Sequence, residues 1–218
     1  MKFDLHLHSC YSTDGFDPPK NFFKVARVKK IDGFSITDHD SIEGSKKAYA
    51  MSKDFENIIV LRAVEISTID GHILAYGVTE LIPKKLSLEE TIDKIHDLGG
   101  IAIAAHPFDF LRVCVGKQVI DTKIDGLEVI NGRTAIGNGK AKKIAKENSF
   151  LVTAGSDAHL AKNIGSCYIE CDANTEDELI YAIKKKTVSV HGKGTLRSLV
   201  FEAIDKRFKK LFGKKSHD

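Results

Sequence analysis

The sequence predicts an α/β domain whose strands form a distorted seven-stranded barrel, a (β/α)7 arrangement similar to a small TIM barrel. Short apolar runs alternate along the chain with patterns typical of helices, and this alternation favours a mainly parallel sheet. Seven such runs occur within 218 residues, which is enough to close or nearly close a barrel. Residues 65–73 are too few for a crossover helix, so regular repetition is expected to fail there.

The seven expected strands are short, apolar and bounded by polar or turn-forming residues. They are expected at residues 3–5, 33–37, 58–66, 73–78, 101–105, 126–130 and 151–154. Three helix starts are marked by their capping signals. These signals are Asp17 before Pro18, Ser87 with Glu90, and Thr175 with Glu178. The last two pairs have the spacing of a capping box, and Gly99 is expected to stop the second helix.

Composition favours a single globular domain with no membrane partner. Hydrophobic residues make up 42% of the chain and charged residues 29%, as is typical of such domains. No apolar run approaches the about 20 residues that span a bilayer, and the N-terminus does not resemble a secretory signal. We therefore expect a cytoplasmic protein. Residues 1–195 should form the barrel domain, and residues 196–218 an amphipathic helix and basic tail that pack on it or extend from it.

Neither the cysteines nor the net charge indicates a special partner. The four cysteines match no zinc-knuckle spacing, so buried free thiols are expected. A net charge of +3 is too small to require a polyanionic partner. The oligomeric state stays open.

The placement of the histidines is the most informative feature of the sequence. Six of the nine fall at or just beyond the end of an expected strand, or in a tight loop between two strands: His6, His8, His39, His72, His106 and His159. In a barrel of parallel strands the carboxyl ends converge on one face, where active sites are built. Packing does not explain polar groups repeated at this position. We therefore expect these side chains to meet in one site.

Alternating residues supply ligand types at both ends of the chain. His6 and His8 share one face of their strand, so both can point at one ion. Asp157 and His159 alternate in the same way after the strand at 151–154. Asp14 lies in a polar loop and is a further candidate ligand, although a turn-forming aspartate is an equally good interpretation.

Charged residues also follow the apolar strand at 33–37. His39 is the expected ligand there, and either Asp38 or Asp40 could orient an imidazole. Helix capping by Asp40 is the alternative interpretation.

An acid and two further histidines lie on the middle strands. Glu65 interrupts an apolar strand, and a buried carboxylate needs a cation or a strong set of donors. The short turn at 69–71 could bring His72 close to it. His106 ends the strand at 101–105, and Pro107 is expected to hold it in an extended conformation. Together these segments supply six histidines, one glutamate and one or two aspartates, a set that suits two or three divalent ions.

The same segments resemble, in sequence and in order, the motifs of the PHP (polymerase and histidinol phosphatase) family. The resemblance is carried by residues 4–9, 37–40, 64–66, 105–107 and 155–159, and it runs from residue 1 to about residue 191. It implies a distorted seven-stranded barrel of the PHP type. It also implies two or three manganese, iron or zinc ions and the hydrolysis of phosphomonoesters or phosphodiesters.

The resemblance further implies how the ligands are divided among the ions. His6, His8 and Asp157 would bind one ion, and Glu65 would bridge it to another. The remaining ligands would serve the second and third ions: Asp14, His39 and His159, and His72 with His106.

The expected reaction is hydrolysis of a phosphate ester by metal-activated water. The expected catalytic residues are Asp38, His39, Asp157 and His159. Asn131 and Arg133 follow another strand end and are expected to contact the phosphate. The expected partner is a small phosphorylated substrate, with a nucleotide or a nucleic-acid end as alternatives. PHP relatives that act on nucleoside bisphosphates or AMP carry a long insertion between the positions of His72 and His106. This chain has only a helix there, so their preference is not carried over.

Two other functions compete with this hypothesis. An amidohydrolase also uses a His-x-His motif on a barrel, but residues 37–40 and 157–159 fit that pattern less well. A non-catalytic RNA-binding scaffold related to the barrel subunit of ribonuclease P would predict eroded ligands and a broad basic surface. The intact ligand set and the modest net charge of +3 favour the enzyme.

Overall fold

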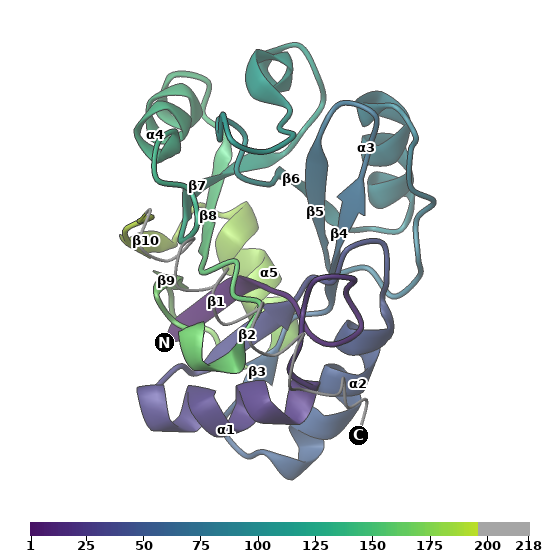
Figure 1. Ribbon diagram of the computed structural model, residues 1–218. Helices are drawn as coiled ribbons and strands as arrows, with labels where there is room; N and C mark the ends of the chain where they lie inside the picture. The colour runs from purple at the N-terminus through teal and green to yellow at the C-terminus, as the bar shows by residue number, and fades with distance from the viewer. Residues whose placement is uncertain (196–218) are drawn as a thin grey trace.

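The computed structural model describes residues 1–195, and the expected helix and tail at 196–218 lie outside the described residues. The described part is a mixed α/β fold with two five-stranded sheets (Figure 1). The strand order is β10-β9-β1-β2-β3 in one sheet and β4-β5-β6-β7-β8 in the other. The α/β class expected from the sequence is confirmed.

The strands are β1 (Lys2–Leu7), β2 (Gly33–Ile36), β3 (Ile59–Val60), β4 (Ala63–Ser67), β5 (His72–Tyr76), β6 (Ile101–Ala104), β7 (Gly126–Asn131), β8 (Leu151–Gly155), β9 (Cys167–Glu170) and β10 (Ser189–Gly192). The α-helices are α1 (Pro19–Lys29), α2 (Glu43–Met51), α3 (Leu88–Asp97), α4 (Asn138–Glu147) and α5 (Glu176–Lys184). No helix within residues 1–195 is long and apolar enough to cross a membrane.

The break between the two sheets falls within residues 58–66, where the sequence predicted one continuous strand. The chain leaves the first sheet after β3 and enters the second at β4, with Leu61 and Arg62 between them. Leu61 is fully buried. Arg62 is held by Glu176 at the start of α5, with Nη2 2.7 Å from Oε2 and Nε 2.9 Å from the same oxygen. These tertiary contacts at the break between the two strands have no local sequence signal.

The expectation of a mainly parallel sheet is wrong, because half of the strand pairs are antiparallel. The parallel pairs are β1–β2, β2–β3, β6–β7 and β7–β8. The antiparallel pairs are β1–β9, β9–β10, β4–β5 and β5–β6. The short turn between β4 and β5 allows no crossover, so these two strands must run in opposite directions.

The two sheets meet near the carboxyl ends of β1, β2 and β8. Leu7 forms an isolated parallel bridge with Ala158, and His39 forms one with Glu65. A Cβ atom at Gly155 would overlap the backbone of His6, so a glycine is required for this close approach. The contacts between the sheets are bridges rather than continuous ladders. The described residues therefore do not show a closed seven-stranded barrel.

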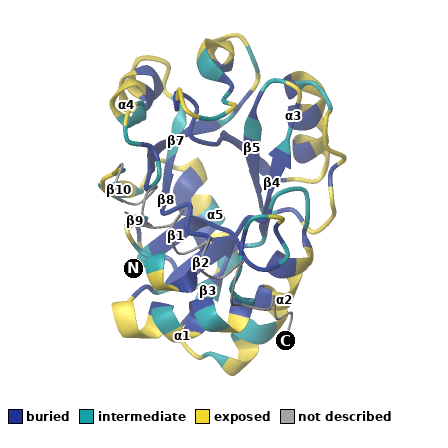
Figure 2. Cartoon of the chain, viewed as in Figure 1, coloured by how far each residue is buried: buried dark blue, intermediate teal, exposed yellow. Residues whose placement is uncertain are grey.

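Two buried cores support this arrangement. The larger one lies among β4 to β8 and the inner faces of α3, α4 and α5, and Figure 2 shows these strands almost entirely buried. The smaller one lies between α1, α2 and the sheet of β1 to β3, where the Phe23 and Phe34 rings pack edge to face at 4.9 Å. The four cysteines are free thiols, as expected, although only Cys10, Cys167 and Cys171 are buried and Cys114 is half-buried.

Helices begin close to all three predicted starts, but only one of the expected caps is complete. α1 begins at Pro19 with Pro18 at the N-cap, and no side chain caps it, so Asp17 does not mark the helix start as expected. At α3, Ser87 Oγ accepts a hydrogen bond from Glu90 N, and Glu90 Oε2 accepts one from Ser87 N. This is the complete capping box, and Gly99 follows the helix with φ +76°. At α5, Thr175 accepts from Glu178 N, but the Glu178 carboxylate accepts from Asn174 N instead of Thr175 N.

Candidate metal centre

The structure brings all nine predicted ligands into one cluster where the two sheets meet. Four sets of three residues have ligand atoms within 4.8 Å of one another. The sets are His6, His8 and Asp157; His8, Asp14 and His159; His8, His39 and Glu65; and Glu65, His72 and His106. His8 and Glu65 are shared between sets, so the cluster is continuous.

Glu65 on β4 lies at the centre of the cluster and is fully buried. Burial alone would raise the pKa of its carboxyl group, but the surrounding imidazoles hold this pKa well below the ordinary value. One carboxylate oxygen faces three rings and the other faces two. Oε2 lies 3.0 Å from His6 Nε2, 3.2 Å from His8 Nε2 and 3.4 Å from His39 Nδ1, and Oε1 lies 3.1 Å from His72 Nδ1 and 3.2 Å from His106 Nε2. This is the arrangement that a bridging ligand requires.

Asp157 and Asp14 provide further negative charge, next to His8 and His159 respectively. Asp157 Oδ1 lies 3.3 Å from His8 Nε2, and Asp14 Oδ2 lies 2.6 Å from His159 Nε2. Burial would raise the pKa of Asp157, but His6 and two nearby arginines keep it well below the ordinary value. Burial would also raise the pKa of Asp14, but its hydrogen bond with His159 holds this pKa well below the ordinary value. Both carboxylates are therefore ionised at neutral pH, as metal ligands must be.

The imidazoles fit divalent ions. The Nδ1 atoms of four buried or half-buried rings lack a hydrogen-bond partner: His8, His39, His72 and His106. A buried polar atom without a partner is costly unless an ion or water completes it. His72 Nδ1 and His39 Nδ1 lie near Glu65 oxygens but are not aligned for hydrogen bonds. Imidazole nitrogen and carboxylate oxygen together suit manganese, iron or zinc.

The two central histidines differ in their protonation. Burial lowers the pKa of His39 to about 4, so its ring is neutral at pH 7 and can bind a cation. Burial also opposes the charge on His8, but hydrogen bonds with Asp157 and Glu65 outweigh it and raise the pKa of His8 to about 9. Ion binding at His8 must therefore release a proton.

Three residues in the cluster or next to it in sequence have strained backbones. Asp40, His106 and Asp157 have φ values of 51°, 32° and 55°, in the left-handed region that non-glycine residues rarely adopt. The expectation that Pro107 holds His106 extended is therefore wrong. His106 is held instead by its own contacts, because its N–H donates to Glu128 Oε2 at 2.8 Å. Such strain is typical of functional sites.

Asp38 and Asp40, the two acids beside His39, accept hydrogen bonds from serine residues and do not orient an imidazole as expected. Asp38 accepts hydrogen bonds from Ser9 N and Ser9 Oγ, both at 2.6 Å. Burial raises the pKa of Asp38 to about 6 despite these bonds. Asp40 accepts from Ser67 N at 2.8 Å, and it does not cap α2, whose N-cap is Ile42. Asp38 thus anchors the turn that follows His8.

The predicted phosphate contacts lie beside Asp157. Arg133 Nη1 is 3.4 Å from Asp157 Oδ1 and 3.2 Å from His159 Nε2. Asn131 is also present, but its side chain is fully buried and bonded to protein groups. Arg133 can therefore reach a ligand at the centre more directly than Asn131.

Two residues of the site were missed from the sequence. Arg112 donates to Asp157 Oδ2 and, through Nη2, to Asn131 Oδ1 at 3.0 Å. It lies in an irregular loop with no pattern that could have identified it. Glu128 lies 2.9 Å from His6 Nδ1. Like Glu65, it is an acid within an apolar strand, so the same signal could have found it.

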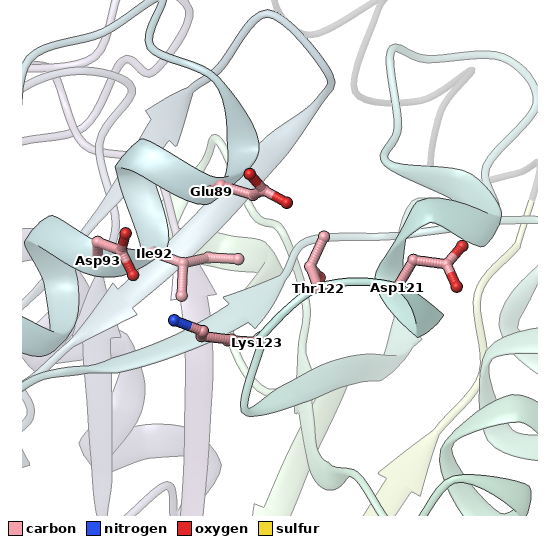
Figure 3. Close-up of a pocket in the computed structure, with 6 residues that line it drawn as sticks. All are labelled: Glu89, Ile92, Asp93, Asp121, Thr122 and Lys123. Carbon is pink, nitrogen blue, oxygen red and sulfur yellow. The ribbon is translucent and has the colours of Figure 1, made fainter.

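The described residues also form a hollow that involves none of the nine ligands. It has a volume of about 210 Å³ and is lined by Glu89, Ile92 and Asp93 of α3 and by Asp121, Thr122 and Lys123. Figure 3 shows the α3 side chains on one wall and residues 121–123 on the other. It lacks histidine and arginine, so it offers neither the imidazole ligands nor the guanidinium groups of the metal centre.

Part of the chain matches a family model, and two relatives are similar to it in sequence. Residues 135–188 match the PHP-associated family named PHP_C. Two uncharacterized proteins of Methanocaldococcus jannaschii are similar to the chain. One is 39% identical over 160 residues, covering 67% of this chain and 93% of the relative, and the other is 30% identical over 179 residues, covering 78% and 70%.

Three solved structures share the fold at low sequence identity. A two-domain protein of Bacteroides vulgatus, which contains a predicted PHP-like metal-dependent phosphoesterase, has a TM-score of 0.74 at 16% identity and covers 94% of this chain and 69% of its own. A candidate metal-dependent phosphoesterase of Bifidobacterium adolescentis has a TM-score of 0.65 at 20% identity, with coverages of 83% and 96%. An amidohydrolase of Chromobacterium violaceum, solved with sulfate and no metal, has a TM-score of 0.63 at 16% identity, with coverages of 86% and 97%.

Proposed function

The chain belongs to the PHP domain family, and from this premise we propose that it is a metal-dependent phosphoesterase acting on small phosphomonoesters or phosphodiesters. The observation that carries the proposal is the cluster of six histidines, Glu65, Asp14 and Asp157 within reach of one another. Eight of the nine ligands lie on or just beyond β1, β2, β4, β5, β6 and β8, and we propose that these strands and β7 correspond to a distorted PHP-type barrel.

The ligand sets support two or three ions. Glu65 faces His72 and His106 with one oxygen and His6, His8 and His39 with the other, so it can bridge two ions. Divalent ions held there would activate water and neutralise the charge that develops on a phosphoryl group. The chain's own contribution is to keep its carboxylates ionised and its imidazoles oriented before the substrate arrives.

Arginine side chains supply the second requirement of a phosphoesterase. Arg112 and Arg133 approach the cluster from loops on either side of β7, and both contact Asp157. Guanidinium groups bind phosphate through paired N–H donors. We propose that Arg133 contacts the phosphate and that Arg112 helps to stabilise the negative charge of that phosphate.

The test is a phosphate-release screen with the full-length protein. Protein purified without chelator and supplied with manganese is expected to hydrolyse p-nitrophenyl phosphate or members of a panel of nucleotides, sugar phosphates, histidinol phosphate and short oligonucleotides. His39→Ala and Asp157→Ala should abolish turnover, because each removes a residue of the cluster. His96→Gln is the matched control, since His96 pairs with Asp125 at 2.9 Å on the surface.

The same screen separates the competing functions. Dihydroorotate and related cyclic amides should remain intact, whereas their hydrolysis without phosphate release would favour an amidohydrolase. Tight RNA binding by protein that contains no metal would favour the scaffold. Full phosphatase activity in His39→Ala would contradict the assignment of the site.

A further inference from the structure

We propose that Glu128 is a positioning residue that holds the proton of His6 on Nδ1 and so directs the His6 Nε2 lone pair into the metal centre. The proposal rests on the proposed metal-dependent function. Nothing in the PHP motifs of this chain assigns a role to Glu128, which lies in the middle of the apolar strand β7 and is 1% exposed.

Both carboxylate oxygens of Glu128 are used. Oε1 lies 2.9 Å from His6 Nδ1. Oε2 accepts one hydrogen bond from His106 N at 2.8 Å and another from Asn131 Nδ2 at 3.0 Å. One buried acid therefore contacts a ring nitrogen of one predicted ligand and the backbone of a second.

The orientation of Asn131 is fixed by backbone groups that can only donate. Its Oδ1 accepts from Arg133 N at 2.9 Å and from Thr134 N at 3.1 Å. The amide nitrogen must therefore point the other way, where it lies 3.0 Å from Glu128 Oε2 and 3.1 Å from Asp157 Oδ2. Asn131 thus acts as a donor to both carboxylates.

These donors determine where the hydrogen between His6 Nδ1 and Glu128 Oε1 lies. Glu128 Oε2 faces two donors that cannot become acceptors, namely the His106 backbone N–H and the fixed amide of Asn131. Imidazole is a stronger base than carboxylate, so the proton shared with Oε1 stays on His6 Nδ1. The ring is then turned so that Nε2, 3.0 Å from Glu65 Oε2 and 3.1 Å from His8 Nε2, is the atom available to a cation. A carboxylate that fixes a ligand histidine in this way tunes both its orientation and its basicity.

Glu128→Gln separates this role from simple packing, because glutamine has nearly the same shape but only one acceptor oxygen. If that oxygen stays with the His106 N–H and Asn131, the new NH₂ group faces His6 Nδ1. His6 must then move its proton to Nε2, the atom that points into the centre. The opposite orientation would place the NH₂ group against two donors, which leaves three buried donors in conflict.

The experiment is NMR of histidine-labelled, full-length protein loaded with zinc, which is diamagnetic. In the wild-type protein the His6 ring should carry its proton on Nδ1, with Nε2 shifted by zinc. Glu128→Gln should lose this Nδ1–H signal and bind zinc and manganese about 10- to 100-fold more weakly by calorimetry. Glu147→Gln, on an exposed face of α4, is the control and should match the wild type.

The outcomes are distinguishable. A wild-type His6 that binds zinc through Nδ1 would overturn the proposal without any variant. A folded Glu128→Gln protein with wild-type metal affinity and an unchanged His6 signal would also overturn it, while leaving the metal-dependent function intact. A wild-type protein that binds neither zinc nor manganese would overturn both.

Discussion

Replacing Glu65 by glutamine should disable the metal centre while leaving the fold intact. The substitution keeps the shape of the side chain but removes a buried charge that faces five imidazole rings at 3.0 to 3.4 Å. With an ion bound, the carboxylate is the partner of a buried cation, and losing one partner of such a buried charge pair costs about 3–5 kcal/mol. Since about 1.4 kcal/mol is a factor of ten in affinity, manganese should bind a hundred- to several-thousand-fold more weakly.

Thermal unfolding with and without manganese makes this loss visible. At a manganese concentration of about 1000 times the wild-type Kd, binding stabilises the native state by about 4 kcal/mol. For a domain of this size that raises Tm by about 8–16 °C. If the affinity of Glu65→Gln falls about 1000-fold, the same concentration stabilises it by only about 0.4 kcal/mol, a shift of about 1–2 °C.

Calorimetric titration with manganese checks the affinity directly, and Glu147→Gln on α4 serves as the control for loss of a surface charge. A Glu65→Gln protein with the wild-type number of bound ions and the wild-type Tm shift would refute the bridging role. Loss of the fold in the metal-free variant would mean that the glutamate stabilises the histidines themselves, not an ion.

Three further predictions concern packing, substrate and pH. Gly155→Ala places a Cβ atom against the backbone of His6 and should lower the stability of the metal-free protein by about 1–3 kcal/mol. The measurement is Tm, which should fall. An unchanged Tm would show that β1 and β8 can move apart without cost. Arg133→Ala should raise KM for a phosphate ester about 10- to 100-fold, because a charged hydrogen bond contributes about 1.5–3 kcal/mol, with kcat less affected; an unchanged KM would remove Arg133 from the substrate site. Burial raises the pKa of Asp4 from 3.8 to about 6, so the contribution of Asp4 to stability is greatest below pH 3.8 and is lost as pH rises through about 6. Between pH 4 and pH 7 the free energy of unfolding should therefore fall in the wild-type protein by an amount that is missing in Asp4→Asn. Denaturation curves with the same pH dependence in the two proteins would contradict this prediction.

The sequence predicts the site better than it predicts the sheet. Histidines at strand ends are found by local pattern, and a residue at a strand end is brought to the site whichever neighbours the strand has. The pairing of strands is not local. The break between β3 and β4 falls at Leu61 and Arg62, and Arg62 bonds to Glu176, 114 residues away in the chain, so no short window of sequence contains both partners.

The residues that support the centre were missed for two different physical reasons. Arg112 reaches Asp157 from an irregular loop, where side-chain direction follows no period. Glu128 carried the same signal as Glu65, a carboxylate within an apolar strand, and its partner His6 lies 122 positions away. The left-handed backbone of His106, with φ 32°, was unexpected because the residue before a proline normally has an extended backbone.

The central claim is that six imidazoles and three carboxylates hold divalent ions between the two sheets. Anomalous X-ray diffraction at the manganese absorption edge, from crystals of the full-length protein grown with manganese, measures this directly. Two or three strong peaks are predicted, with Glu65 between at least two of them. A map with no peak among these side chains would contradict the claim.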